Sequence, residues 1–135
     1  MTLAPAIAAI NEYMRLDLIN TAKRKGEYLG GKAKRNQREA QVSWGHPRAR
    51  ALFWAVELVE NRKTKTPFYE SADQLAGRPS LLDRISSDVM SQGVYVVNWP
   101  SHFVIAPPLI ITEEEIDRGV EALDKSLEIA DVEAS

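Results

Sequence analysis

The chain has 135 residues, of which 44% are hydrophobic, and this composition is enough to bury one core in a single domain. The absence of cysteine excludes disulfides, thiolate metal sites and a cysteine nucleophile, and only two histidines disfavour a zinc site. A formal net charge of -2 gives no general attraction to nucleic acid, and without a membrane-length apolar run or a signal-peptide pattern we expect a cytoplasmic protein.

The first predicted element is one long amphipathic helix at the N-terminus. Apolar residues recur at helical spacing from Leu3 to Leu29, Thr2 is placed as the N-cap, and Pro5 is tolerated in the first turn. Gly30-Gly31 weakens this pattern, and the polar stretch that follows predicts the end of the helix and a loop.

A buried strand is predicted over residues 51–59. This segment is almost continuously apolar and rich in strand formers, so we expect a central strand that is buried on most of both faces and ends at Glu60-Asn61. Residues 61–79 contain proline and glycine with little periodicity, which predicts a long surface connection.

A second helix is predicted to begin near Ser80 and to end near Gly93, where a left-handed residue is expected. Its buried stripe is formed by Leu82, Ile85 and Val89. Two strands over residues 94–97 and 102–106 follow, and the turn residues 98–101 between them predict a hairpin.

The last predicted unit is a strand, a proline pair and a capped helix. Pro107-Pro108 lacks amide donors and must end the strand, while Thr112 and Glu115 have the spacing of a capping box. Glu113 to Glu115 place negative charge at the positive end of the helix dipole, which explains them without a metal site. The helix is predicted to extend to Ile129, with an inward stripe of Ile116, Val120, Leu123, Leu127 and Ala130.

This order of elements predicts the α+β class. We expect a small, mostly antiparallel sheet of about three to four strands, with helices packed on one face and a long N-terminal helix, in one domain over residues 1–135.

Two of these segments resemble the C-terminal small domain of class III pyridoxal-phosphate-dependent aminotransferases of fold type I, such as omega-amino-acid:pyruvate aminotransferases. Residues 47–59 (PRARALFWAVELV) are similar to the family's VRGxGLFWALEL strand. Residues 93–96 (GVYV), followed by residues 105–112 (IAPPLIIT), resemble its hairpin and final helix start. The resemblance covers nearly the whole chain, and the large cofactor-binding domain of the family is absent from it.

The resemblance implies a part of an enzyme rather than a complete one. Complete members exchange an amino group between an amine or omega-amino acid and a keto acid through pyridoxal 5'-phosphate, whose aldimine lysine belongs to the large domain. The seven lysines of this chain lie in polar, surface-like contexts, whereas a Schiff-base lysine needs a depressed pKa. We therefore expect no catalytic residue, no cofactor and no activity in this chain alone.

The family's substrate-binding arginines have no counterpart at the matching positions of this chain, which carry Ile105 and Val97. The family's strand glycines are replaced by Ala49 and Ala51, which puts a positive φ there in doubt. By resemblance, four residues are candidates for the substrate-binding edge of the pocket, although turn chemistry, packing or a strand start also explains them: Asn98, Trp99, His102 and Arg48.

Two other readings use different surfaces. The chain could be a stand-alone oligomerisation or partner-binding module, in which the face that meets the large domain supports self-association or binds a large-domain chain. Seven basic residues between Lys23 and Arg38 could contact phosphates, but we interpret them as a solvated helix face because no aromatic platform accompanies them, so nucleic acid is disfavoured.

Overall fold

The computed structural model describes residues 3–35, 43–44, 48–61, 64, 66–67, 77, 79–99 and 102–133. Within them the helices are α1 (Ala4–Arg15), α2 (Leu18–Arg35), α4 (Leu81–Ser91), α5 (Glu113–Ser126) and α6 (Glu128–Glu133). The strands are β1 (Ser43–Trp44), β2 (Arg48–Arg50), β3 (Phe53–Asn61), β4 (Thr66–Pro67), β5 (Val97–Trp99) and β6 (His102–Ile105). No helix in these ranges has both the length and the apolar character needed to cross a membrane.

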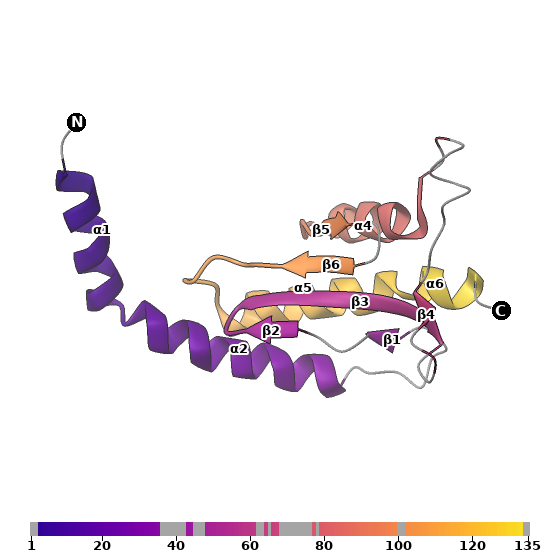
Figure 1. The fold of residues 1–135 in the computed structure, drawn as a ribbon, viewed down its shortest axis with the longest axis horizontal. Helices are drawn as coiled ribbons and strands as arrows, with labels where there is room; N and C mark the ends of the chain where they lie inside the picture. Colours follow the sequence, from indigo (N-terminus) through magenta and orange to yellow (C-terminus); the bar gives the residue numbers. More distant parts are fainter. Residues whose placement is uncertain are drawn as a thin grey trace.

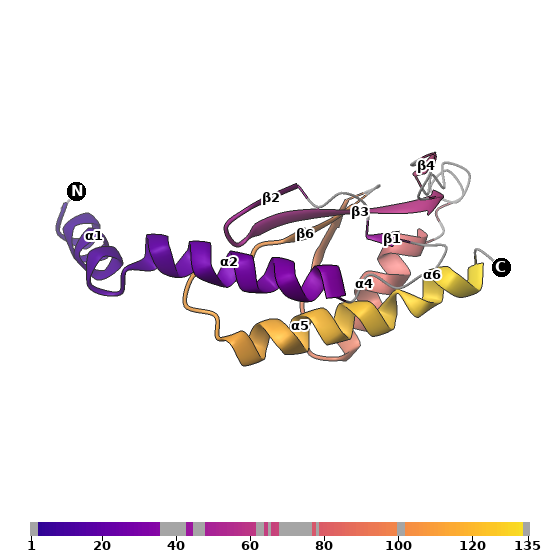
Figure 2. The same cartoon turned by 90° about the horizontal axis from the view of Figure 1, so that it is seen from below.

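Strand β3 is the centre of the sheet. It pairs antiparallel with β1, β2, β4 and β6, and β5 is added beyond β6 (Figure 1). Helices α2, α4, α5 and α6 lie on one side of these strands (Figure 2). The predicted α+β class, with an antiparallel sheet and helices on one face, is therefore confirmed. The opposite side, which no described helix covers, is called the outer sheet face below.

The central strand differs from the prediction in its start and in its burial. Ala51 and Leu52 form the turn between β2 and β3, so the strand begins at Phe53. Trp54, Val56 and Leu58 are buried on the helical face, whereas on the other face Phe53 is 60% exposed, Ala55 and Glu57 are half-buried, and Val59 is buried. The expectation of burial on most of both faces therefore holds on the helical side but fails at Phe53, because no described helix covers the other face.

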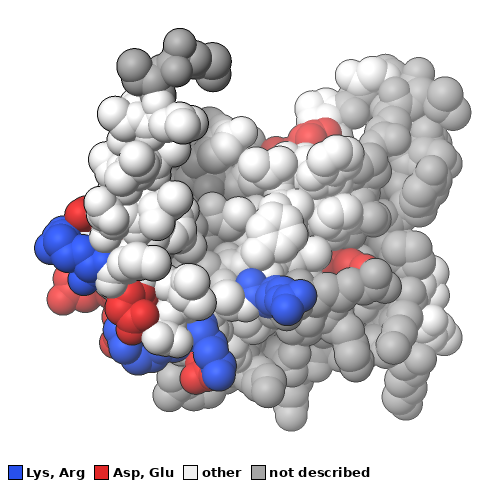
Figure 3. All heavy atoms as spheres, turned by 60° about the vertical axis from the view of Figure 1, so that its left-hand side comes forward, with Lys and Arg blue, Asp and Glu red and all other residues white. Residues whose placement is uncertain are grey.

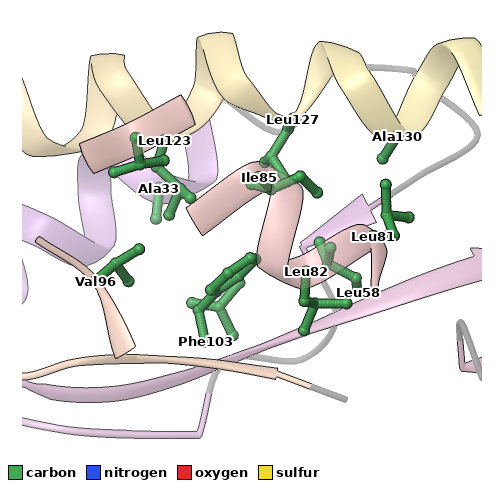
Figure 4. Packing of buried hydrophobic residues seen from close by; sticks show 12 residues of the cluster. Ala33, Leu58, Leu81, Leu82, Ile85, Val96, Phe103, Leu123, Leu127 and Ala130 are labelled. Atoms are coloured by element: carbon green, nitrogen blue, oxygen red, sulfur yellow. The ribbon is translucent and has the colours of Figure 1, made fainter. Parts of the chain in front are cut away.

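The main core lies between the sheet and helices α4, α5 and α6 (Figure 4). Phe103 of β6 is fully buried and lies in this layer with Leu58, Leu82 and Ile85. A second cluster forms where α2 and α5 meet β3, and its largest member is Trp54. The buried stripes predicted for the second and the last helix are confirmed, since all of their residues are buried: Leu82, Ile85, Val89, Ile116, Val120, Leu123, Leu127 and Ala130.

The predicted long N-terminal helix is divided in two. Helix α1 ends at Arg15, and Asp17 adopts a left-handed conformation with φ of 46°. Asn20 donates to the carboxylate of Asp17 at 2.9 and 3.1 Å, and the amide of Thr21 bonds to its carbonyl. Asp is one of the few residue types that tolerate this conformation, so the break is local. The predicted N-cap Thr2 lies outside the described residues.

Helix α2 continues through Gly30-Gly31 and ends at Arg35, within the polar stretch in which the sequence predicts its end. A Cβ on Gly30 would lie 2.8 Å from the Trp54 ring, so the glycine allows the helix to pack closely on that side chain. Helix α2 is also tied to α5, because Tyr28 donates to Asp117 at 3.0 Å and Lys32 Nζ lies 2.8 Å from the same carboxylate.

Local signals at the other helix ends are confirmed. Ser80 and Thr112 cap α4 and α5 with complete capping boxes, and Gly93 has φ of 82°. The hairpin is shifted toward the turn, however, because β5 includes residues 98 and 99, which the sequence assigned to the turn. Pairing with β6 keeps these residues extended.

Candidate functional site

The outer sheet face carries two rows of side chains that cross β5, β6 and β3. Residues that are directly opposite in an antiparallel pair point to the same side of the sheet. The first row is Val97, Val104 and Ala55, and the second is Trp99, His102 and Glu57. Two of the four predicted pocket-edge residues, Trp99 and His102, are thus neighbours in one row.

Trp99 and His102 form a stacked ring pair. Their ring centroids are 6.3 Å apart and the ring planes differ by 3°. Trp99 is 57% exposed and Phe53, on the same face, is 60% exposed. Large apolar side chains on an uncovered sheet face are typical of a surface that contacts another protein segment or a ligand.

The structure turns Asn98 away from this ring pair. Its register partner is the buried Phe103, so its side chain is on the helical side, where Nδ2 donates to Asp83 Oδ1 at 2.7 Å. Hydrogen bonds from the side chain and the backbone of Ser80, and then from Asn98, lower the pKa of Asp83. Asp83 escaped the sequence reasoning, although its spacing from Ser80 is that of a capping box.

Arg48, the fourth candidate, belongs to β2, where its backbone is opposite Ala55. Its side chain lies outside the described part of the structure. The exposed Arg50 is opposite Phe53 at the same end of the sheet. A substrate-binding role for any of the four candidates stays a prediction.

The turn between β2 and β3 has the positive φ that alanine in place of the family's glycine had put in doubt. Ala51 has φ of 52°, the left-handed conformation that glycine adopts most easily. A Cβ on Gly26 would lie 2.1 Å from the Ala51 carbonyl oxygen, so this turn also approaches the α2 backbone closely. The conformation therefore survives in a chain that carries alanine there.

Helix α1 provides a second uncovered apolar surface. None of its residues is buried, and the apolar ones include Ile7 (59% exposed), Ile10 (56%) and Met14 (76%). Figure 3 shows mainly uncharged atoms on α1 and on the central face beside it, with many of the charged atoms gathered at the lower left. The helical spacing identified these residues correctly as one stripe, but within the described structure nothing buries them.

The described metal-ligating side chains and lysines can be compared with what a metal ion and pyridoxal phosphate require. No group of three or more potential metal-ligating residues occurs among them. Lys23 and Lys125 are exposed, and Lys32 is paired with Asp117. Hydrogen bonds to Asp117, and then to Tyr28, raise the pKa of Lys32, whereas a Schiff-base lysine requires a lowered one. The raised pKa of Lys32 is the opposite of what the aldimine lysine of a pyridoxal-phosphate enzyme requires.

No family model matches the chain, but individual proteins do. An uncharacterised aminotransferase of Schizosaccharomyces pombe is 33% identical over 133 residues, covering 90% of this chain and 27% of that protein. A leucine/methionine racemase of Thermococcus litoralis is 30% identical over 128 residues, covering 95% of this chain and 26% of that protein.

Solved structures agree. An S-selective transaminase from Arthrobacter sp. has 26% identity and a TM-score of 0.78, covering 93% of this chain and 28% of that one. The chain thus spans about a quarter of the length of these relatives. By sequence and by fold, the chain matches the C-terminal part of class III aminotransferases.

Proposed function

We propose that this chain is the C-terminal domain, or a fragment, of a pyridoxal-phosphate-dependent aminotransferase. The observation that carries the proposal is the coverage: at least nine tenths of the chain matches an aminotransferase, but only about a quarter of that enzyme is matched. The complete enzyme would move an amino group from an amine or omega-amino acid to a keto acid, and the cofactor would supply the chemistry of that transfer.

The chain by itself is catalytically inactive in this proposal. Lys23 and Lys125 are exposed, and the ion pair of Lys32 with Asp117 raises the pKa of Lys32, whereas a Schiff-base lysine requires a lowered one. The contribution of the chain is therefore to shape and to cover, through the outer sheet face, a site whose cofactor is held elsewhere.

Addition of pyridoxal phosphate to the purified chain, followed by borohydride reduction and mass mapping, tests this inactivity. We expect weak labelling spread over several surface lysines, while an intact class III aminotransferase treated in parallel is labelled at one lysine. Stoichiometric labelling of a single lysine in this chain would show that it holds the cofactor by itself.

The partner in this proposal is the remaining polypeptide of the aminotransferase. It would cover the outer sheet face and the apolar stripe of α1, because both expose large apolar side chains that gain free energy when they leave water. Each surface is uncovered among the described residues, and the chain spans only about a quarter of the length of this relative.

Co-purification with the N-terminal three quarters of a related transaminase tests this partner. Ile10→Lys on α1 and Phe53→Lys on the sheet should each reduce recovery of the complex. Met90→Lys is the matched control, since Met90 is 52% exposed on α4 and belongs to neither surface. Equal loss in all three variants would mean that the lysines act through solubility or stability rather than through the interface.

A second candidate function rests on the same exposed side chains. In this candidate the chain is a stand-alone module that associates with itself through α1 and the outer sheet face. Light scattering over a range of concentrations distinguishes the two. A monomer at high concentration excludes self-association, whereas a dimer that Phe53→Lys dissociates and Met90→Lys leaves intact supports it.

A further inference from the structure

One carboxylate connects two elements that are far apart in the chain. Asp83 Oδ2 accepts hydrogen bonds from the backbone amide of Ser80 at 2.9 Å and from its hydroxyl at 2.8 Å, which closes the capping box of α4. The other oxygen, Oδ1, accepts from Asn98 Nδ2 at 2.7 Å. Because the capping box fixes the carboxylate relative to α4, Asn98 is bound to a rigid point.

Strand β5 is held at its start by the buried Val96, whose carbonyl accepts a hydrogen bond from Ser86 Oγ of α4 at 3.2 Å, but it has few constraints beyond that point. It is only three residues long and, among the described strands, pairs with β6 alone. Its two other side chains, Val97 and Trp99, are on the outer face and are 41% and 57% exposed. Asn98 is thus the one residue of the strand whose side chain reaches toward the helical layer. Short edge strands depend strongly on such additional contacts.

We propose that Asp83 and Asn98 form a clamp that positions the Trp99–His102 ring pair on the outer sheet face. Trp99 follows Asn98 directly, so a fixed Asn98 sets where the exposed indole stands over β6. His102 is directly opposite Trp99 in the ladder, and the two rings are nearly parallel. Asp83 and Asn98 are positioning residues, because they act on the ring pair through the backbone of β5.

The clamp gives Asn98 a role that differs from substrate contact. One consequence rests on the proposed function. If the outer sheet face covers the site of a complete aminotransferase, the clamp sets how far the two aromatic rings project from that face. The clamp itself needs no partner chain and can be tested in this chain alone.

Two variants separate the clamp from the helix cap. Asn98→Ala removes the bond to β5 and leaves the capping box, while Ser80→Ala removes the hydroxyl of the cap and leaves the bond from Asn98. We expect Asn98→Ala to speed amide hydrogen exchange in β5 and β6 about fivefold, the loss that one such bond implies. It should also shift the ring proton resonances of Trp99 and His102. Ser80→Ala should change exchange mainly in the first turn of α4.

The proposal is overturned if the ring resonances of Asn98→Ala match those of the unchanged chain. It is equally overturned if Ser80→Ala shifts the rings as much as Asn98→Ala does, because the effect would then be a general loosening of α4.

Asn98→Asp allows the clamp to be broken and restored in one sample by a change of pH. At neutral pH two carboxylates would face each other at hydrogen-bond distance, so β5 should lose protection relative to the unchanged chain at the same pH. Since like charges raise the pKa of such a pair, a shared proton should restore the bond on acidification. Recovery of the relative protection in acid is the expected result, and a loss that does not depend on pH would contradict the clamp.

Discussion

At the scale of one residue, Gly26 allows α2 to lie directly against the β2–β3 turn because glycine has no side chain. A Cβ at this position would lie 2.1 Å from the carbonyl oxygen of Ala51 and 2.3 Å from its carbon, distances that no backbone tolerates. The same carbonyl accepts a hydrogen bond from Trp54 Nε1 at 2.8 Å, so it cannot turn away without losing a partner. The helix and the β2–β3 turn are therefore in direct backbone contact.

Gly26→Ala should lower the free energy of unfolding by about 2 kcal/mol, because forced overpacking outweighs the better helix propensity of alanine. Gly31→Ala is the matched control on the same helix, since an added Cβ there meets nothing within 4 Å. The control should gain up to about 1 kcal/mol. Urea unfolding measures both, and equal effects of the two substitutions would contradict the close contact at Gly26.

Ala51 is a second residue whose backbone conformation affects the stability of the fold. With φ of 52°, its backbone is in the left-handed region, which costs a non-glycine residue about 1–2 kcal/mol. Ala51→Gly removes this strain but adds conformational freedom to the unfolded chain. We expect a net stabilisation of about 0.5 kcal/mol, seen as a higher urea midpoint. A lower midpoint would mean that the turn is not strained.

At the scale of the element, the start of α5 is stabilised by charge as well as by hydrogen bonds. Hydrogen bonds from the backbone and the hydroxyl of Thr112 lower the pKa of Glu115 below its ordinary value of 4.5. A lowered carboxylate pKa contributes stability that is present above the ordinary value and is lost as the pH falls through the lowered one. Acidification should therefore weaken this helix start.

Glu115→Gln isolates that contribution, because glutamine keeps the capping box but does not ionise. The free energy of unfolding of the variant, followed from neutral pH down to about pH 3, should fall less steeply than that of the unchanged chain. Glu114→Gln is the control, since it removes a charge from the same turn without touching the capping bonds. Identical pH profiles for the two variants would show that the capping bond does not matter.

At the scale of the whole molecule, α1 stands apart from the packed body (Figures 1 and 2). None of its residues is buried, and the left-handed Asp17 separates it from α2. Deletion of residues 1–15 should therefore change the free energy of unfolding by less than about 0.5 kcal/mol.

Leu29→Ala provides the contrast to this deletion. Leu29 is 3% exposed on α2, and its truncation should cost about 2–4 kcal/mol. Urea unfolding compares the two changes. A large loss of stability on removing α1 would show that the helix packs on the domain after all.

Much of the fold follows from signals that act within a few residues. The caps at Ser80 and Thr112 and the proline stop after Ile105 depend only on neighbours in sequence, so the sequence predicted them correctly. The apolar stripes of α4 and α5 were equally accessible, because burial on one helix face leaves a period that can be counted. The family, too, is visible in two short motifs.

Other features depend on residues that are distant in sequence, and only the tertiary structure decided them. Gly30 remains helical because Trp54 lies against it, and Phe53 is exposed because no helix covers that face of β3. Asn98 points inward because it is opposite the buried Phe103, and there Asp83 of α4 accepts its hydrogen bond. The amino-acid sequence by itself thus determined the elements, their caps and the family, since these depend on local patterns. Which face of each element is covered, and by what, required the contacts between elements.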